Sequence, residues 1–241
     1  MTRVDSVKKL ATSKTPLQGL SICFDLDGTL VDTAPDLVRV TNEVIGTEGL
    51  PETNYKLARS VVGFGSRRLI TDALARADHC VTTARVDEMQ QDFLRRYADD
   101  ISLLSNPYSG VIETLGTLKS LGASLSVCTN KPGWLARPLL EELAMTHWFD
   151  TIVGGDEAPR AKPDPRHVFM AAGHRDSSRI VMVGDSQPDM VAAQRSGAYA
   201  ILMTYGYSHS PQIRLRADAR LRNFRDLTPA LINRYGSALA R

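Results

Sequence analysis

Residues 24–37 read FDLDGTLVDTAPDL, and this stretch places two acidic residues directly after an apolar segment. The residues just before them, LSICF at 20–24, are typical of a buried strand. Asp25 and Asp27 follow one residue apart, and Gly28 comes next. Like charges at the end of a buried strand repel each other unless a cation or hydrogen bonds offset them. Because Asp and Gly also favour turns, these residues alone leave open a simple turn or a metal and phosphate site.

The composition favours a cytoplasmic protein that binds neither nucleic acid nor membrane. The 241 residues are 43% hydrophobic, which allows one large domain or two smaller ones. A net charge of +2 does not indicate a nucleic-acid-binding protein, and three cysteines without CxxC spacing indicate neither a disulfide framework nor a zinc site. No apolar run is long enough to span a membrane. Residues 1–18 lack the apolar segment of a secretory signal, so we expect a flexible N-terminal tail there. Nothing in the sequence indicates an oligomeric state.

Strand-like runs alternate with segments of helical spacing along most of the chain. The runs are LSICFDLD at 20–27, ASLSVCTN at 123–130, DTIVGGD at 150–156, RIVMVGD at 179–185 and AYAILMTYG at 198–206. This alternation predicts an α/β fold with a doubly wound, mostly parallel sheet covered by helices on both faces. In such folds ligands bind beyond the carboxyl ends of the strands. The polar residues that follow these runs should therefore lie around one cleft.

One part of the chain departs from this alternation. Between residues 35 and 107 no run resembles a buried strand, whereas residues 36–48, 67–77 and 86–100 have helical patterns. We therefore expect residues 35–107 to form a helical cap inserted into an α/β core of residues 19–34 and 108–241. Such a cap would act as a lid over the cleft.

Four segments with reactive side chains follow strand-like runs or lie in the loops after them. They are DLDGT at 25–29, TNK at 129–131, KPDP at 162–165 and GDS at 184–186, the last with Asp189 after it. Together they resemble the motifs of the haloacid dehalogenase superfamily of phosphohydrolases, over residues 24–207. The resemblance implies a Rossmann-like core, a small-molecule phosphoester substrate and Mg²⁺ as cofactor.

The resemblance also implies roles for the acidic residues. Asp25 would be the nucleophile that carries an aspartyl-phosphate. Asp27 would be the general acid and base, and its backbone carbonyl would join the Asp25 and Asp185 carboxylates as metal ligands. A cation is needed because the attacking carboxylate and the phosphoryl group are both anionic. Gly28 would permit the sharp turn that brings Asp27 over the phosphate.

The remaining motif residues have two interpretations each. Thr129 and Asn130 suit phosphoryl oxygens, or they could cap a helix before Pro132. Lys162 suits a phosphoryl oxygen and the Asp25 carboxylate, with Lys131 as a rival for this role. The superfamily pattern favours Lys162.

Asp189 also has two interpretations. It could support the site by orienting a metal-bound water or holding Lys162. Alternatively it could be a first-turn acid that interacts with its helix dipole.

Within the superfamily, the chain is most similar to the phosphoglycolate phosphatase group. The similar segments include DTAPDL at 32–37, VGFG at 62–65, VCTNKP at 127–132, VGDSQPDM at 183–190 and YGYSH at 205–209. This resemblance implies hydrolysis of 2-phosphoglycolate, a small phosphomonoester with a separate carboxylate. We expect Arg67 or Arg68 to bind that carboxylate, although both could equally be exposed helix arginines.

Other activities stay open at this point. Dehalogenases of this fold lack the second acid, which is Asp27 here, and sugar-phosphate mutases carry a His where this chain has Leu37. Pyrophosphate hydrolysis and sugar-phosphate hydrolysis remain alternatives. A different class would be a receiver-like regulatory protein or a non-catalytic phosphate-binding module. Receiver domains are about half as long and lack the Asp-x-Asp-Gly-Thr segment.

Overall fold

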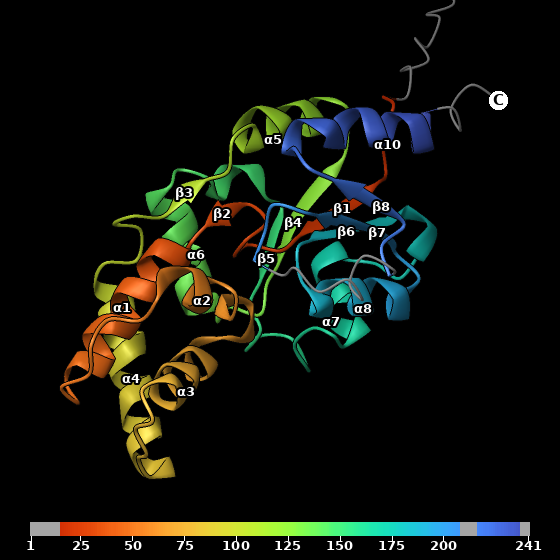
Figure 1. Cartoon of the computed structure of the whole chain (residues 1–241). Coiled ribbons are helices and arrows are strands. Elements are labelled where there is room, and N and C mark those ends of the chain that lie inside the picture. Colours follow the sequence, from red (N-terminus) through yellow and green to blue (C-terminus); the bar gives the residue numbers. More distant parts are fainter. Residues whose placement is uncertain (1–14, 208–215, 237–241) are drawn as a thin grey trace, which may run out of the picture.

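A computed structural model describes residues 15–207 and 216–236. Its centre is a six-stranded sheet in the order β5-β4-β1-β6-β7-β8, with every neighbouring pair parallel (Figure 1). The strands are β1 (Ser21–Phe24), β4 (Ser124–Cys128), β5 (Thr151–Val153), β6 (Ile180–Gly184), β7 (Tyr199–Met203) and β8 (Ala219–Leu221). The predicted α/β fold with a parallel sheet is confirmed.

Apolar side chains alternate between the two faces of the sheet, and helices cover both faces. Ile22 and Phe24 of β1 belong to the core beneath α5 (Val111–Ser120) and α10 (Leu227–Tyr235). Cys23 belongs instead to a second core with residues of α7 (Pro165–Ala172) and α8 (Gln187–Ser196). Figure 1 shows α5 and α10 over one face of the sheet and α7 and α8 over the other. Helix α6 (Gly133–Glu142) packs beside β5. The sheet is therefore buried on both sides, which explains its nearly continuous apolar strands.

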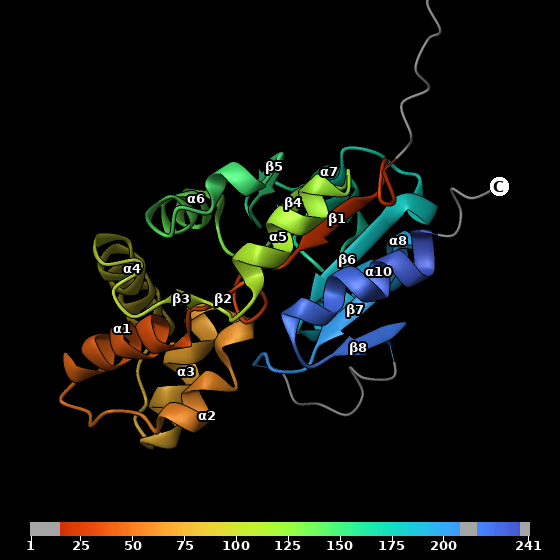
Figure 2. The ribbon, with the colours of Figure 1, turned by 90° about the horizontal axis from the view of Figure 1, so that it is seen from above.

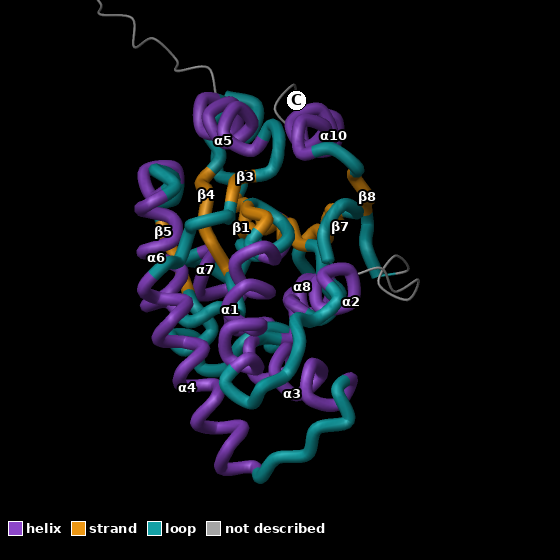
Figure 3. Tube along the Cα trace, turned by 60° about the vertical axis from the view of Figure 1, so that its left-hand side comes forward, coloured by secondary structure: helices purple, strands orange, loops and turns teal. Residues whose placement is uncertain are grey.

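The chain leaves the sheet through β2 (Val31–Asp32) and returns through β3 (Asn106–Pro107), and these two short strands pair antiparallel. Between them lie α1 (Ala34–Gly46), α2 (Tyr55–Arg59), α3 (Ser66–Arg76) and α4 (Thr83–Asp99). We call residues 33–105 the helical insertion. Figures 2 and 3 show its helices grouped to one side of the sheet. Its designation as a cap domain that acts as a lid stays a prediction.

The N-terminal part of the core begins earlier than expected. Residues 1–14 of the predicted tail lie outside the described residues, as do residues 208 and 209 of the YGYSH segment. Leu17, however, is fully buried, and its backbone N–H donates to the Leu121 carbonyl at 2.9 Å. Among the described helices, none has both the length and the apolar character needed to cross a bilayer.

Candidate active site

Three adjacent strands end in the residues that sequence motifs single out. Asp25 follows β1, Thr129 follows β4 and Asp185 follows β6, and the sheet order is β4-β1-β6. The Asp25 N–H still donates to the Val183 carbonyl at 2.9 Å, so the strand pairing continues up to the acid. The three side chains consequently lie at the same edge of the sheet, as parallel strands require.

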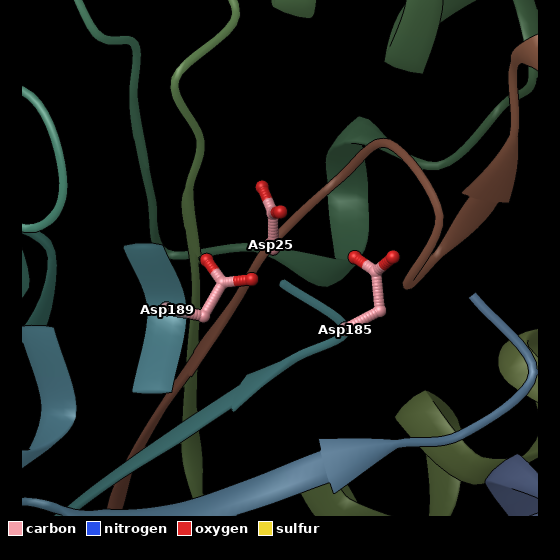
Figure 4. A group of neighbouring side chains, drawn as sticks. All are labelled: Asp25, Asp185 and Asp189. Carbon is pink, nitrogen blue, oxygen red and sulfur yellow. The ribbon is translucent and has the colours of Figure 1, made fainter. Parts of the chain in front are cut away.

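Asp25, Asp185 and Asp189 form a buried acidic cluster (Figure 4). Each offers a carboxylate oxygen, and these oxygens all lie within 4.8 Å of one another. Burial raises the pKa of the Asp25 carboxyl group to about 7, with the charges of Asp189 and Asp27 adding to the shift and Lys162 opposing it. Burial, together with the charges of Asp189 and Asp25, raises the pKa of Asp185 well above its usual range. Such a crowded set of oxygen ligands fits a divalent cation such as Mg²⁺.

Lys162 lies against one side of this cluster. Its Nζ is 2.9 Å from Asp25 Oδ1 and 2.6 Å from Asp189 Oδ1, and only 1% of its side chain is exposed. Burial opposes the charged form, but the two carboxylates raise the pKa of Lys162 overall. Asp189 in turn accepts a 2.9 Å hydrogen bond from the Ser186 N–H. The structure thus places Asp189 where it holds Lys162.

The Asp27 carboxylate is held by residues outside the acidic cluster. Its Oδ1 accepts a hydrogen bond from the Thr33 hydroxyl at 2.6 Å and from Lys131 Nζ at 3.1 Å. The turn between Asp27 and β2 requires Gly28, whose φ is +82°. A Cβ at that position would approach Asp185 Oδ2 to 2.7 Å. Gly28 therefore serves both the turn and the close packing of Asp185.

Thr129 and Asn130 do not cap the following helix. The N-cap of α6 is Pro132, without a side-chain hydrogen bond. The buried Thr129 hydroxyl accepts from the Lys131 N–H at 3.1 Å, and the Asn130 side-chain amide donates to the Lys162 carbonyl at 2.9 Å. Asn130 therefore fixes the loop that carries Lys162, while both residues also line the cavity described next.

A cavity of about 490 Å³ lies between the strand ends and the helical insertion. Its core side includes Asp25, Asp27, Thr129, Asn130, Lys131 and Asp185, and its other wall consists mainly of apolar residues of α3, α4 and the loop before α3. Arg67 lines this cavity but pairs with Asp87. Arg68 is exposed and does not line it. The structure thus brings Asp25, Asp27, Thr129, Asn130 and Asp185 to one cavity. Lys162 contacts this group through Asp25, and Asp189 contacts it through Lys162, without either lining the cavity, and Arg68 lies apart from it.

Sequence reasoning missed three residues that hold this site together. Thr33 donates to Asp27, Tyr97 accepts from Lys131 Nζ at 2.9 Å, and the Tyr207 N–H donates to Asp185 Oδ2 at 2.7 Å. Thr33 and Tyr207 do fall in the DTAPDL and YGYSH segments, which was a usable signal. Tyr97 lies in an α4 segment whose apolar spacing indicates packing alone.

Comparison with known proteins gives matches over most of the chain. Residues 22–203 match the family described as haloacid dehalogenase-like hydrolase. A phosphoglycolate phosphatase of Caulobacter vibrioides is 41% identical over 90% of this chain and 92% of its own length. One of Agrobacterium fabrum is also 41% identical, over 92% of this chain and 96% of its own.

A solved structure also matches this chain over most of its length. A crystal structure described as a predicted phosphoglycolate phosphatase from Haemophilus somnus superposes with a TM-score of 0.80 at 32% identity. The alignment covers 89% of this chain and 98% of that one. The similarity thus includes the helical insertion as well as the sheet.

Proposed function

Because the chain belongs to the haloacid dehalogenase-like hydrolase family and is a phosphomonoester hydrolase, we propose that it hydrolyses 2-phosphoglycolate with Mg²⁺ through a phosphorylated Asp25. The substrate proposal is supported by the names of the relatives that match at 41% identity. The cytoplasmic location expected from the sequence stays a prediction.

The observation that carries the mechanism is the orientation of Asp25. Both of its contacts, from Lys162 Nζ at 2.9 Å and from the Leu26 N–H at 2.8 Å, are made by Oδ1. Within the described residues Oδ2 accepts no hydrogen bond, and Asp25 lines the cavity. One oxygen is therefore held while the other is left for attack on phosphorus.

The reaction then proceeds in two displacements. Asp25 Oδ2 forms a bond to phosphorus as the bond to the leaving oxygen breaks, and Asp27 gives its proton to that oxygen. Asp27 next takes a proton from a water molecule, which attacks phosphorus and breaks its bond to Asp25. Thr129, at the end of β4, offers a hydroxyl to the phosphoryl oxygens, and Lys162 offsets the charge of Asp25.

Mg²⁺ would be held by the carboxylates of Asp25 and Asp185 and by the Asp27 carbonyl, and it would neutralise charge on the phosphoryl group. Asp185 is prepared for this role because Thr29 and the Tyr207 N–H fix its two oxygens at 3.2 Å and 2.7 Å. Leu37 lines the cavity, so an apolar side chain stands where sugar-phosphate mutases carry a His. Hydrolysis therefore fits the site better than transfer to a second sugar.

The test is phosphate release from a panel of 2-phosphoglycolate, hexose phosphates, nucleotides and pyrophosphate, with Mg²⁺ or with a chelator. We expect the highest kcat/KM for 2-phosphoglycolate and no turnover with the chelator. Asp25→Asn should lower kcat by about 10³-fold or more, since the nucleophile is lost. Asp99→Asn is the matched control, because Asp99 is exposed at the end of α4. Full turnover by Asp25→Asn would refute the mechanism, and a preference for pyrophosphate would refute the substrate.

A further inference from the structure

Lys131 is a buried cation at the wall of the cavity. Its side chain is 5% exposed, and it lies in the loop between β4 and α6. Its Nζ donates to Asp27 Oδ1 at 3.1 Å and to the Tyr97 hydroxyl at 2.9 Å. The same Nζ is 4.4 Å from the centre of the Tyr97 ring. Burial of an ammonium group costs free energy, and its partners only partly offset that cost. A buried lysine beside a cavity is therefore a candidate for ligand binding.

Among the described residues that line the cavity, two carry a positive charge, Lys131 and Arg67. Arg67 forms an ion pair with Asp87, and 43% of the Arg67 side chain is exposed. Lys162 does not line the cavity and is held between Asp25 and Asp189. Lys131 is thus the cation that is both buried and directed at the side of the cavity where Asp27 lies.

The ammonium group of a lysine has three N–H donors. Within the described chain, Lys131 uses one for Asp27 and one for Tyr97, which leaves one donor for a ligand. The surrounding wall includes the apolar residues Leu37, Phe93 and Leu135, so this donor lies beside apolar side chains. A charge-assisted hydrogen bond is strong in such surroundings.

The position of Asp27 fixes what Lys131 can contact. In the proposed mechanism Asp27 approaches the leaving oxygen, and Lys131 Nζ lies 3.1 Å from Asp27 Oδ1. In 2-phosphoglycolate a single methylene carbon separates the leaving oxygen from the carboxylate. We propose that Lys131 binds that carboxylate and so selects phosphomonoesters whose leaving group carries a negative charge close to the ester oxygen. This inference rests on the proposed phosphatase function and gives the carboxylate a different partner from Arg67.

Tyr97 orients the ammonium group from the helical insertion. Its side chain is almost fully buried, and it comes from α4, whereas Asp27 and Lys131 come from the core. The specificity contact therefore forms only where the insertion and the core meet. A substrate carboxylate on Lys131 would lie at that same boundary.

The test compares two substrates that share a phosphate but differ in the leaving group, 2-phosphoglycolate and 2-hydroxyethyl phosphate. The measured quantity is the ratio of their kcat/KM values with Mg²⁺, in which any effect common to both substrates cancels. Loss of one charge-assisted hydrogen bond should lower this ratio by about 10- to 100-fold in Lys131→Met. Lys119→Met is the matched control, since Lys119 pairs with Asp150 on the surface, and Arg67→Met tests the rival cation. Both should keep the ratio of the unmodified enzyme.

The outcomes separate this inference from the proposed function. If the unmodified enzyme does not prefer 2-phosphoglycolate, the proposed substrate is wrong and the inference falls with it. If it does, but Lys131→Met keeps the preference or Arg67→Met loses it, the inference alone is overturned. A crystal structure of Asp25→Asn with Mg²⁺ and 2-phosphoglycolate gives a second measurement that does not depend on how Lys131→Met folds. A carboxylate within hydrogen-bonding distance of Lys131 Nζ supports the inference, and one bound to Arg67 overturns it.

Discussion

Gly28 directly follows Asp27 in the chain and packs against the carboxylate of Asp185. Its φ of +82° lies in the left-handed region, where residues with a Cβ are strained. Space is lacking too, because a Cβ would come 2.7 Å from Asp185 Oδ2 and 2.8 Å from the Tyr207 ring. The glycine therefore matters for the position of a proposed metal ligand as well as for the turn.

Gly28→Ala should consequently impair both folding and metal binding. The backbone strain alone should lower the free energy of unfolding by about 1–2 kcal/mol. Displacement of Asp185 should in addition weaken Mg²⁺ binding, which isothermal titration calorimetry and activity against Mg²⁺ concentration would measure. Gly49→Ala is the matched control, since its φ is +73° and nothing lies within 4 Å of its Cβ position. If both variants bind Mg²⁺ equally well, the steric argument is wrong.

The meeting of Asp25, Thr129 and Asp185 could be predicted from the sequence because it follows from topology. Each residue directly follows a predicted strand, and parallel neighbours end at the same edge. The contact between Lys131 and Tyr97 could not be predicted in this way. It depends on how α4 packs against the core, and apolar periodicity indicates which face of a helix is buried but not what it meets. The catalytic roles of all these residues stay predictions.

Helix α1 begins without a side-chain cap of its own. Thr33 occupies the N-cap position, but its hydroxyl donates to Asp27. The N–H groups of Thr33 and Ala34 donate instead to the Tyr207 hydroxyl, at 2.7 Å and 3.0 Å. That hydroxyl lies 2.9 Å from Asp32 Oδ1, to which it donates. A residue after β7 thus satisfies the first N–H groups of the helical insertion, which would otherwise lack partners.

Tyr207→Phe should therefore destabilise the start of α1. Removal of the hydroxyl leaves two N–H groups and a carboxylate without this partner, which should lower the free energy of unfolding by about 1–3 kcal/mol. Urea denaturation would measure the change. Tyr55→Phe, at a position 42% exposed, should have little effect. Equal stability of the two variants would contradict the proposed capping role.

The elements that sequence reasoning did not identify include the shortest ones. Helix α2 has five residues and β8 has three, with Arg220 at its centre, so neither shows enough periodicity to identify it. Long apolar runs such as 179–185 located the central strands correctly, because strands buried on both faces are apolar throughout. The paired strands β2 and β3 have two residues each and arise from the way the insertion joins the core.

The stability of the whole chain should depend on pH through its acidic cluster. Asp25 has a pKa of about 7 in the folded chain, against an ordinary value of 3.8, and Asp185 is shifted in the same direction. Between these values the folded chain retains protons that the unfolded chain has already lost. The contribution of these groups to stability therefore decreases as the pH rises through that range. Mg²⁺ requires ionised carboxylates, so protons compete with it.

We accordingly expect the increase in melting temperature caused by Mg²⁺ to grow from about pH 5 to about pH 8. Scanning calorimetry with Mg²⁺ and with a chelator would measure it. Burial and the charge of Lys162 lower the pKa of His167 to about 4, which makes stability rise with pH between that value and 6.5. Because His167 titrates both with Mg²⁺ and with the chelator, its effect cancels in the difference between the two melting temperatures. In Asp185→Asn the Mg²⁺-induced increase in melting temperature should no longer grow with pH. If that increase were the same at every pH in the unmodified chain, the expectation would be contradicted.

The paired strands β2 and β3 have a consequence for how such enzymes can diverge. Val31 pairs with Pro107 and Asp32 with Asn106, so the two ends of the helical insertion are fixed side by side. The number of residues between them can change without altering the distance that the connections must span. Gain or loss of a helix there leaves the register of the six-stranded sheet intact. Gene duplication followed by length variation at this one position could thus yield new enzymes on an unchanged six-stranded sheet.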